Sequence, residues 1–146
     1  MTPPDPSDLD AMRRRGAKML VVRGTADGVF SVEDTAAWYE ALNQRLGGRA
    51  AEAVRFFRVP GMGHSRGGPA TDQYDALSAL VDWVERGVAP DRIVAAARGT
   101  GNAGGVNADV PSTWSATRTR PLCPYPLVAR YKSGDSELAA SFACER

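Results

Sequence analysis

The sequence predicts an α/β fold built on a parallel β-sheet. Two apolar segments rich in β-branched or aromatic residues, 18–24 and 53–61, have the pattern of strands. Each is followed by a polar loop and then by a segment whose apolar residues recur at helical spacing. Strand, loop and helix repeated in this order are typical of βαβ units on a parallel sheet.

The length and composition of the chain fit one globular domain with a core. It has 146 residues, of which 43% are hydrophobic and 24% charged, and a formal net charge of +1. Such a charge attracts neither nucleic acid nor an anionic membrane, so we expect neither as a partner. No apolar run reaches the roughly 18 residues of a membrane helix. The first residues lack the apolar core of a signal peptide, so we expect no export signal in this chain.

The first half of the chain contains one clear strand and one clear helix. Residues 1–16 are proline-rich, then acidic, then basic, and predict a leading segment with a short helix over 8–15. Residues 18–24 form the first strand, which ends at a glycine. The letters SVED at 31–34 resemble a capping box, with Asp34 in place of the usual Glu, and predict a helix that begins at Ser31. Its apolar face comprises Val32, Ala36, Tyr39 and Leu42, and Gly47 and Gly48 end it.

The second half begins with the strand at 53–61 and continues with a second helix. Asp72 is the predicted cap of that helix, and Gly87 is its predicted end. Residues 92–96 predict a further short strand and residues 127–131 an edge strand, whereas 99–109 have no periodicity and predict a flexible loop. The predicted apolar face of the second helix comprises Tyr74, Leu77, Val81 and Val84.

Asp27 and His64 are the candidate catalytic residues. In open α/β sheets, binding and chemistry occur at the carboxyl ends of the strands. The loops TADGVF and GMGHSRGG follow the two predicted strands, which places Asp27 and His64 on the same rim of the sheet. A carboxylate there can orient an imidazole that acts as a general base. A surface histidine and a turn aspartate are the alternatives.

Residues 63–67 also fit G-x-S-x-G, the nucleophile elbow of α/β-hydrolases, which would make Ser65 the attacking group. Pro60 and Gly61 interrupt the approach to this turn, and two glycines follow it, each costing a helix roughly 1 kcal/mol. His64 is the only histidine, and the base of an α/β-hydrolase follows its serine in the chain. The order of the residues in the chain favours His64 as the base and predicts a nucleophilic serine upstream of Asp27. The only serine before Asp27 in this chain is Ser7.

The chain has two cysteines, Cys123 and Cys144. They are too few for a metal site, which usually needs three or four ligands, but they suit one disulfide. We expect neither a metal ion nor a cofactor.

Several stretches resemble the C-terminal part of the tannase and feruloyl esterase family, which includes mono(2-hydroxyethyl) terephthalate hydrolases. They are GTADGVF, VPGMGH, GGPATDQYDALSALVDWVERGVAPDRIVA, RTRPLCPYPLVARYKSGD and the final FAC, and the resemblance as a whole covers residues 8–144. The resemblance implies secreted or periplasmic serine esterases with an α/β-hydrolase core and a large lid domain, often with calcium in the lid. Such enzymes cleave esters of phenolic acids such as gallate and ferulate.

By this resemblance Asp27 matches the triad acid and His64 the triad base. Cys123 and Cys144 match a disulfide, which would contribute about 3 kcal/mol in the chain-entropy model. Phe30, one turn beyond Asp27, is a weaker candidate to line the acyl pocket, and a core aromatic beneath the helix start is the alternative. The family has a cysteine directly after the triad histidine, bonded to a cysteine beside the nucleophile. Ser65 occupies that position, so this tie cannot form here.

The resemblance also implies a division of the chain. After the leading segment, residues 17–98 would be the C-terminal part of an α/β-hydrolase core, 99–117 a flexible loop, and 118–146 a cysteine-containing tail packed on the core. The lid and the N-terminal half, with the nucleophile, are expected outside this chain. We therefore expect an inactive chain that associates with that half or with itself, and whose completed site takes an aromatic ester. The alternative is a non-catalytic fragment or binding module.

Overall fold

The computed structural model describes residue 5 and residues 8–146, so the predicted leading segment is described only in part and Ser7 lies outside the described residues. The elements are α1 (Asp10–Arg14), β1 (Met19–Gly24), α2 (Val32–Arg45), η1 (Ala50–Glu52), β2 (Val54–Val59), β3 (Gln73–Tyr74), α3 (Ala76–Arg86), β4 (Ile93–Ala96), β5 (Thr119–Leu122), β6 (Val128–Tyr131), η2 (Ala139–Ser141) and β7 (Phe142–Glu145). Both predicted long helices and all four predicted strands are therefore present, with small shifts at their ends.

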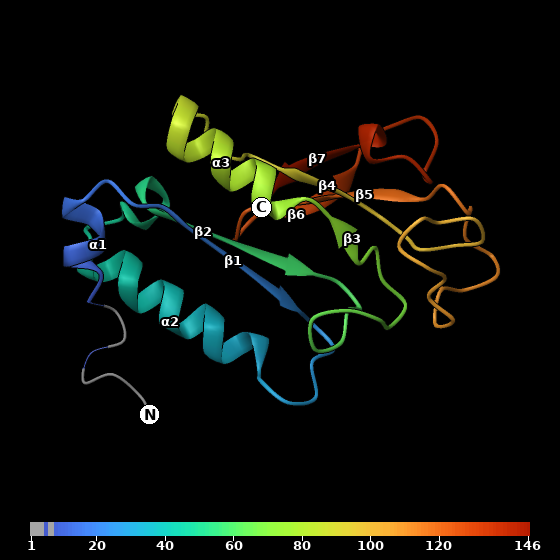
Figure 1. Ribbon diagram of the computed structural model, residues 1–146, viewed down its shortest axis with the longest axis horizontal. Helices are drawn as coiled ribbons and strands as arrows, with labels where there is room; N and C mark the ends of the chain where they lie inside the picture. Colours follow the sequence, from blue (N-terminus) through green and yellow to red (C-terminus); the bar gives the residue numbers. More distant parts are fainter. Residues whose placement is uncertain (1–4, 6–7) are drawn as a thin grey trace.

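The predicted parallel β-α-β unit is formed by β1, α2 and β2. Its two strands pair in parallel from Met19 opposite Val54 to Gly24 opposite Val59. The parallel sheet does not extend to the predicted strand at 92–96, because β4 joins an antiparallel sheet in the order β3-β4-β5. The predicted edge strand is β6, which forms an antiparallel hairpin with β7. In Figure 1, α2 lies on one side of the β1-β2 pair, and α3 and the antiparallel strands lie on the other.

The strand β2 is the centre of the core. Its side chains alternate, so that Val54 and Phe56 pack with α2, and Phe57 and Val59 pack with residues of β4 and β5. All four are fully buried. A strand covered on both faces reads as a nearly continuous apolar run, which is why β2 is visible in the sequence.

The ends of the helices are set by side-chain and glycine caps. Ser31 caps α2 as predicted, because its hydroxyl accepts hydrogen bonds from the amides of Glu33 and Asp34. Gly87 ends α3 in the left-handed conformation, also as predicted. The predicted cap of α3 is wrong: Asp75 accepts a hydrogen bond from the Ser78 amide at 2.8 Å. Asp72 lies before β3, and its side chain forms a buried ion pair with Arg98 instead of capping the helix.

The predicted apolar face of α3 is only partly buried. Leu77 is 72% exposed and Val84 57%, whereas the buried side chain of this helix is Trp83. The helical period is therefore correct, but within this chain α3 packs through a different face. No helix of the described part of the chain is long and apolar enough to cross a membrane.

The predicted disulfide between Cys123 and Cys144 is present. Cys123 follows β5, and Cys144 lies in β7, so the bond connects the last hairpin to the antiparallel sheet. The preceding segment, 99–117, contains turns but no helix or strand.

Candidate active site

The loops after β1 and β2 bring Asp27 and His64 together. Because the two strands are parallel and in register, their carboxyl ends lie at the same edge of the sheet. There the Nδ1 atom of His64 lies 2.9 Å from Oδ2 of Asp27. The predicted placement of these two residues on one rim is confirmed.

Asp27 is surrounded by hydrogen-bond donors. Its Oδ1 accepts from the amides of Val29 and Phe30 at 2.8 and 3.1 Å, and its Oδ2 accepts from Arg23 at 3.1 Å. The side chain is only 2% exposed. The hydrogen bond with His64 is the largest influence on the pKa of Asp27; with the backbone amides it outweighs burial, which raises the pKa, and lowers it from 3.8 to about 2. Asp27 is therefore ionised at neutral pH.

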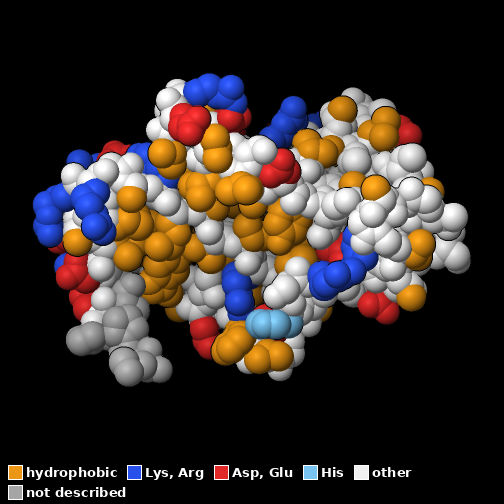
Figure 2. All heavy atoms as spheres, viewed as in Figure 1, with side chains coloured by type: hydrophobic (Ala, Val, Ile, Leu, Met, Phe, Trp, Pro, Cys, Tyr) orange, Lys and Arg blue, Asp and Glu red, His pale blue; other side chains and the backbone are white. Residues whose placement is uncertain are grey.

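The charge of Asp27 fixes the tautomer of His64. An ionised carboxylate can only accept hydrogen bonds, so Nδ1 of His64 must carry the hydrogen that it shares with Asp27. In the neutral imidazole, Nε2 then has a free lone pair and can accept a proton. The His64 side chain is half exposed, and Figure 2 shows the imidazole at the surface beside hydrophobic side chains. The pair thus has the arrangement of a general base oriented by an acid.

Backbone contacts hold the Asp27 loop against the His64 loop. The Ala26 amide donates to the Met62 carbonyl at 3.0 Å, and the Gly61 amide donates to the Thr25 hydroxyl at 2.9 Å. Gly24, at the end of β1, permits this approach, because a Cβ there would lie 2.2 Å from the Met62 carbonyl oxygen.

Ser65 does not form a nucleophile elbow. It has a φ of +79° at the centre of a tight turn, in which the Arg66 amide donates to the His64 carbonyl at 3.1 Å. An elbow requires a helix that starts at the serine, but the next helix begins at Ala76. The adjacent imidazole is already oriented by Asp27. The geometry therefore favours His64 as the functional residue of this loop.

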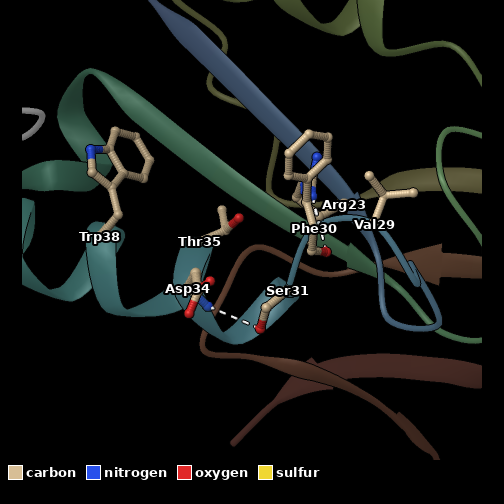
Figure 3. A pocket seen from close by; sticks show the side chains of 7 residues that line it. All are labelled: Arg23, Val29, Phe30, Ser31, Asp34, Thr35 and Trp38. Carbon is tan, nitrogen blue, oxygen red and sulfur yellow. Dashed lines mark hydrogen bonds between the residues drawn. The ribbon is translucent and has the colours of Figure 1, made fainter. Parts of the chain in front are cut away.

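Phe30 lies beside the Asp27–His64 pair. Its ring centroid is 5.4 Å from that of His64, and the Arg23 guanidinium lies 5.5 Å from the Phe30 centroid. The side chain is 57% exposed, so within this chain Phe30 is not part of the core. Phe30 and Arg23 border an open depression of about 490 Å³ that continues along α2 to Trp38 (Figure 3). The other lining residues are Val29, Ser31, Asp34 and Thr35.

Two features near the site were missed in the sequence. Arg23 contacts Asp27 directly. The sequence pattern that could have indicated this contact is a basic residue within an apolar strand, four residues before an aspartate. The second feature is a buried ion pair between Asp72 and Arg98, which has no local signal because its partners are 26 residues apart. Within the described residues, no three His, Cys, Asp or Glu side chains are grouped so that they could hold a metal ion.

Comparison with known proteins identifies the family. The model of the "Tannase and feruloyl esterase" family matches residues 2–145. The chain belongs to this family. It is 52% identical over 139 residues to the mono(2-hydroxyethyl) terephthalate hydrolase of Piscinibacter sakaiensis, covering 94% of this chain and 21% of that protein. It is 35% identical over 143 residues to a probable feruloyl esterase of Arthroderma benhamiae, and this match covers 95% of this chain and 25% of that protein.

The solved structures agree with the family and with an α/β fold. The crystal structure of an esterase from Aspergillus oryzae superposes with a TM-score of 0.76 at 28% identity, and the match covers 94% of this chain and 29% of that one. The chain therefore spans between about a fifth and three tenths of the lengths of these relatives.

Proposed function

We propose that this chain is the C-terminal portion of a serine carboxylic ester hydrolase of the tannase and feruloyl esterase type, and that it supplies two residues of the catalytic triad. Asp27 is the acid and His64 the base. The observation that carries this proposal is the 2.9 Å contact between them at the ends of two adjacent parallel strands. It leaves Nε2 of His64 available on a half-exposed ring.

In the proposed reaction, Nε2 of His64 removes the proton of a serine hydroxyl as the serine oxygen attacks the ester carbonyl carbon. Asp27 stabilises the imidazolium that forms. The ester C–O bond then breaks, the alcohol leaves with the proton from His64, and an acyl-enzyme remains. Water, deprotonated by His64, hydrolyses this intermediate and restores the serine. Each proton taken up by His64 is returned, so no further reactant is needed.

The serine is proposed to come from an N-terminal half outside this sequence. One support is that this chain spans only 21% of the length of the Piscinibacter sakaiensis relative. Another is the outer edge of β1, which has no strand partner among residues 8–146. An unpaired strand edge is a template for another strand. We propose that the N-terminal half, supplied by a longer polypeptide or a separate chain, pairs there; self-association through this edge is the alternative. A folded monomer that stays monomeric when the half is added would contradict both.

The proposed substrate is an aromatic carboxylic ester. The relatives' names include feruloyl esterases and a terephthalate monoester hydrolase, whose substrates have an aromatic acyl group. Phe30 is the proposed contact for that ring, because it is exposed and adjacent to His64. The disulfide supports a secreted or periplasmic location for the assembled enzyme, since such bonds persist in oxidising compartments.

Labelling with a fluorophosphonate, followed by peptide mapping, tests the proposal. The folded chain alone should take no label. A mixture with the remaining N-terminal part of the Piscinibacter sakaiensis relative should be labelled on a serine of that part, and His64→Ala should greatly slow this reaction. Label on Ser65 would show that the elbow interpretation is correct. A folded, associated mixture without label would favour the non-catalytic binding module.

A further inference from the structure

The loop that carries His64 is held from outside by a ring of hydrogen bonds. The Gly67 amide donates to Oδ2 of Asp72 at 2.7 Å, and the Gly68 amide donates to Oδ2 of Asp109 at 2.9 Å. The Gly68 carbonyl accepts from Nδ2 of Asn107 at 2.8 Å. Three side chains thus hold three backbone groups of Gly67 and Gly68, at the end of the His64 loop.

A buried ion pair connects these contacts. Arg98 donates to both carboxylate oxygens of Asp72, from Nε at 3.0 Å and from Nη2 at 2.7 Å. The Asp72 side chain is fully buried and that of Arg98 is 7% exposed. The Arg98 carbonyl accepts from the Asn107 amide at 2.8 Å, which closes the ring back to Gly68. A bidentate pair of this kind fixes orientation as well as distance.

The His64 loop needs such support because its own backbone is unusually free. Gly67 and Gly68 have φ values of +77° and +75°, and Ser65 has a positive φ without being a glycine. Glycine loses more conformational freedom on folding than any other residue. Gly68 also crosses Gly61 so closely that a Cβ would lie 2.1 Å from the Gly61 carbonyl oxygen. External contacts therefore add to the restraint that the loop's own hydrogen bond, from the Gly63 amide to the Gly67 carbonyl, provides.

We infer that Asp72, Arg98, Asn107 and Asp109 are positioning residues, which hold the His64 loop in the conformation that places the imidazole on Asp27. The segment around 107–109 acts as a clamp on this loop, although the sequence predicts only a flexible loop there. The imidazole is hydrogen-bonded to Asp27, whereas three of these side chains are bonded to Gly67 and Gly68, so their effect on His64 passes through the two glycines. The inference rests on the proposed function only in assigning a catalytic purpose to the position of His64.

The test uses the single histidine of the chain as its own probe. In NMR spectra of the folded chain, the Nδ1 proton of His64 reports the bond with Asp27, and its exchange with water reports opening of that bond. Asp109→Ala removes the exposed contact to the Gly68 amide. Asn107→Ala removes the part-buried contact to the Gly68 carbonyl and, in addition, the hydrogen bond that Oδ1 of Asn107 accepts from the Asp109 amide. Asp109→Ala should accelerate this exchange about fivefold, as expected for one net hydrogen bond, and Asn107→Ala should accelerate it at least as much because two hydrogen bonds are lost. Exchange of the β2 amides should stay as in the wild type.

Two matched variants complete the experiment. Asp109→Asn keeps an oxygen that can accept from the Gly68 amide, and should exchange within about twofold of the wild type. Asp91→Ala removes the same atoms from an aspartate whose side chain is 91% exposed and whose ion pair, with Arg55, does not involve the His64 loop, and it should leave the exchange of the His64 proton unchanged. The inference is wrong if Asp109→Ala and Asn107→Ala leave His64 unchanged, or if they accelerate the β2 amides equally. Inactivity of the wild-type mixture with its N-terminal half would instead contradict the proposed function, whatever the NMR result.

Discussion

Removal of the Cys123–Cys144 disulfide should cost a large part of the stability of the chain. The two cysteines are 21 residues apart, and closing a loop of that length restricts the unfolded chain by about 3 kcal/mol in the entropy model. The free energy of unfolding of a typical domain is only about 5–15 kcal/mol. For a chain of this size, each kcal/mol corresponds to a melting temperature shift of about 3–4 °C, so Cys123→Ala/Cys144→Ala should melt about 10 °C lower.

The measurement is urea and thermal unfolding followed by circular dichroism, with and without a phosphine reductant. The reductant should lower the midpoint of the wild type and leave the double variant unchanged, because the chain has no other cysteine. Cys123 is buried, so alanine there also removes a packed sulfur atom, and reduction of the wild type separates the loss of the bond from that loss of packing. Equal midpoints for the oxidised wild type and the double variant would show that the disulfide does not stabilise the chain.

Three further predictions concern the ion pair, the acid of the site and the aromatic residues. Arg98→Met should lower the free energy of unfolding in urea by about 3–5 kcal/mol, since it leaves the buried Asp72 charge unpaired, whereas Asp72→Leu/Arg98→Met should cost much less. Because the folded pKa of Asp27 is depressed, its contribution to stability is complete above pH 3.8 and is lost as the pH falls towards about 2; Asp27→Asn should flatten the dependence of the urea midpoint on pH in that window. Phe56→Ala should cost about 3–5 kcal/mol because the side chain is fully buried, whereas Phe30→Ala should change unfolding little but weaken aromatic ester binding in the assembled enzyme.

The β1-α2-β2 unit and the position of Asp27 and His64 could be predicted because their signals are local. The strands are short apolar runs, Ser31 caps the helix between them, and parallel pairing alone places both following loops at one edge. The register of the two strands places the Asp27 and His64 loops side by side, whereas the conformation of the His64 loop also involves distant contacts from Asn107 and Asp109. This part of the fold is therefore readable from residues close together in the chain.

The environment of Asp72 could not be predicted because it depends on a distant partner. An aspartate ahead of an apolar helical segment is a typical helix cap, and nothing nearby indicates that Arg98 reaches it instead. The same limit applies to Asn107 and Asp109. They lie in a segment without periodicity, and both contact Gly68, which is about 40 residues away in the sequence. On α3, the spacing of Leu77 and Val84 correctly predicts a helix but not which face the rest of this chain covers.

The most direct test of the proposed site is ester hydrolysis by a fusion in which this chain replaces the matching C-terminal part of the Piscinibacter sakaiensis relative. The fusion should hydrolyse an aromatic monoester, and Asp27→Asn should lower kcat by about 10⁴-fold with the fold intact, because the imidazole loses the partner that fixes its tautomer. Ser65→Ala should retain activity. A folded fusion that keeps its kcat in Asp27→Asn or His64→Ala, or that loses it in Ser65→Ala, would contradict the assignment of Asp27 and His64 as the acid and base.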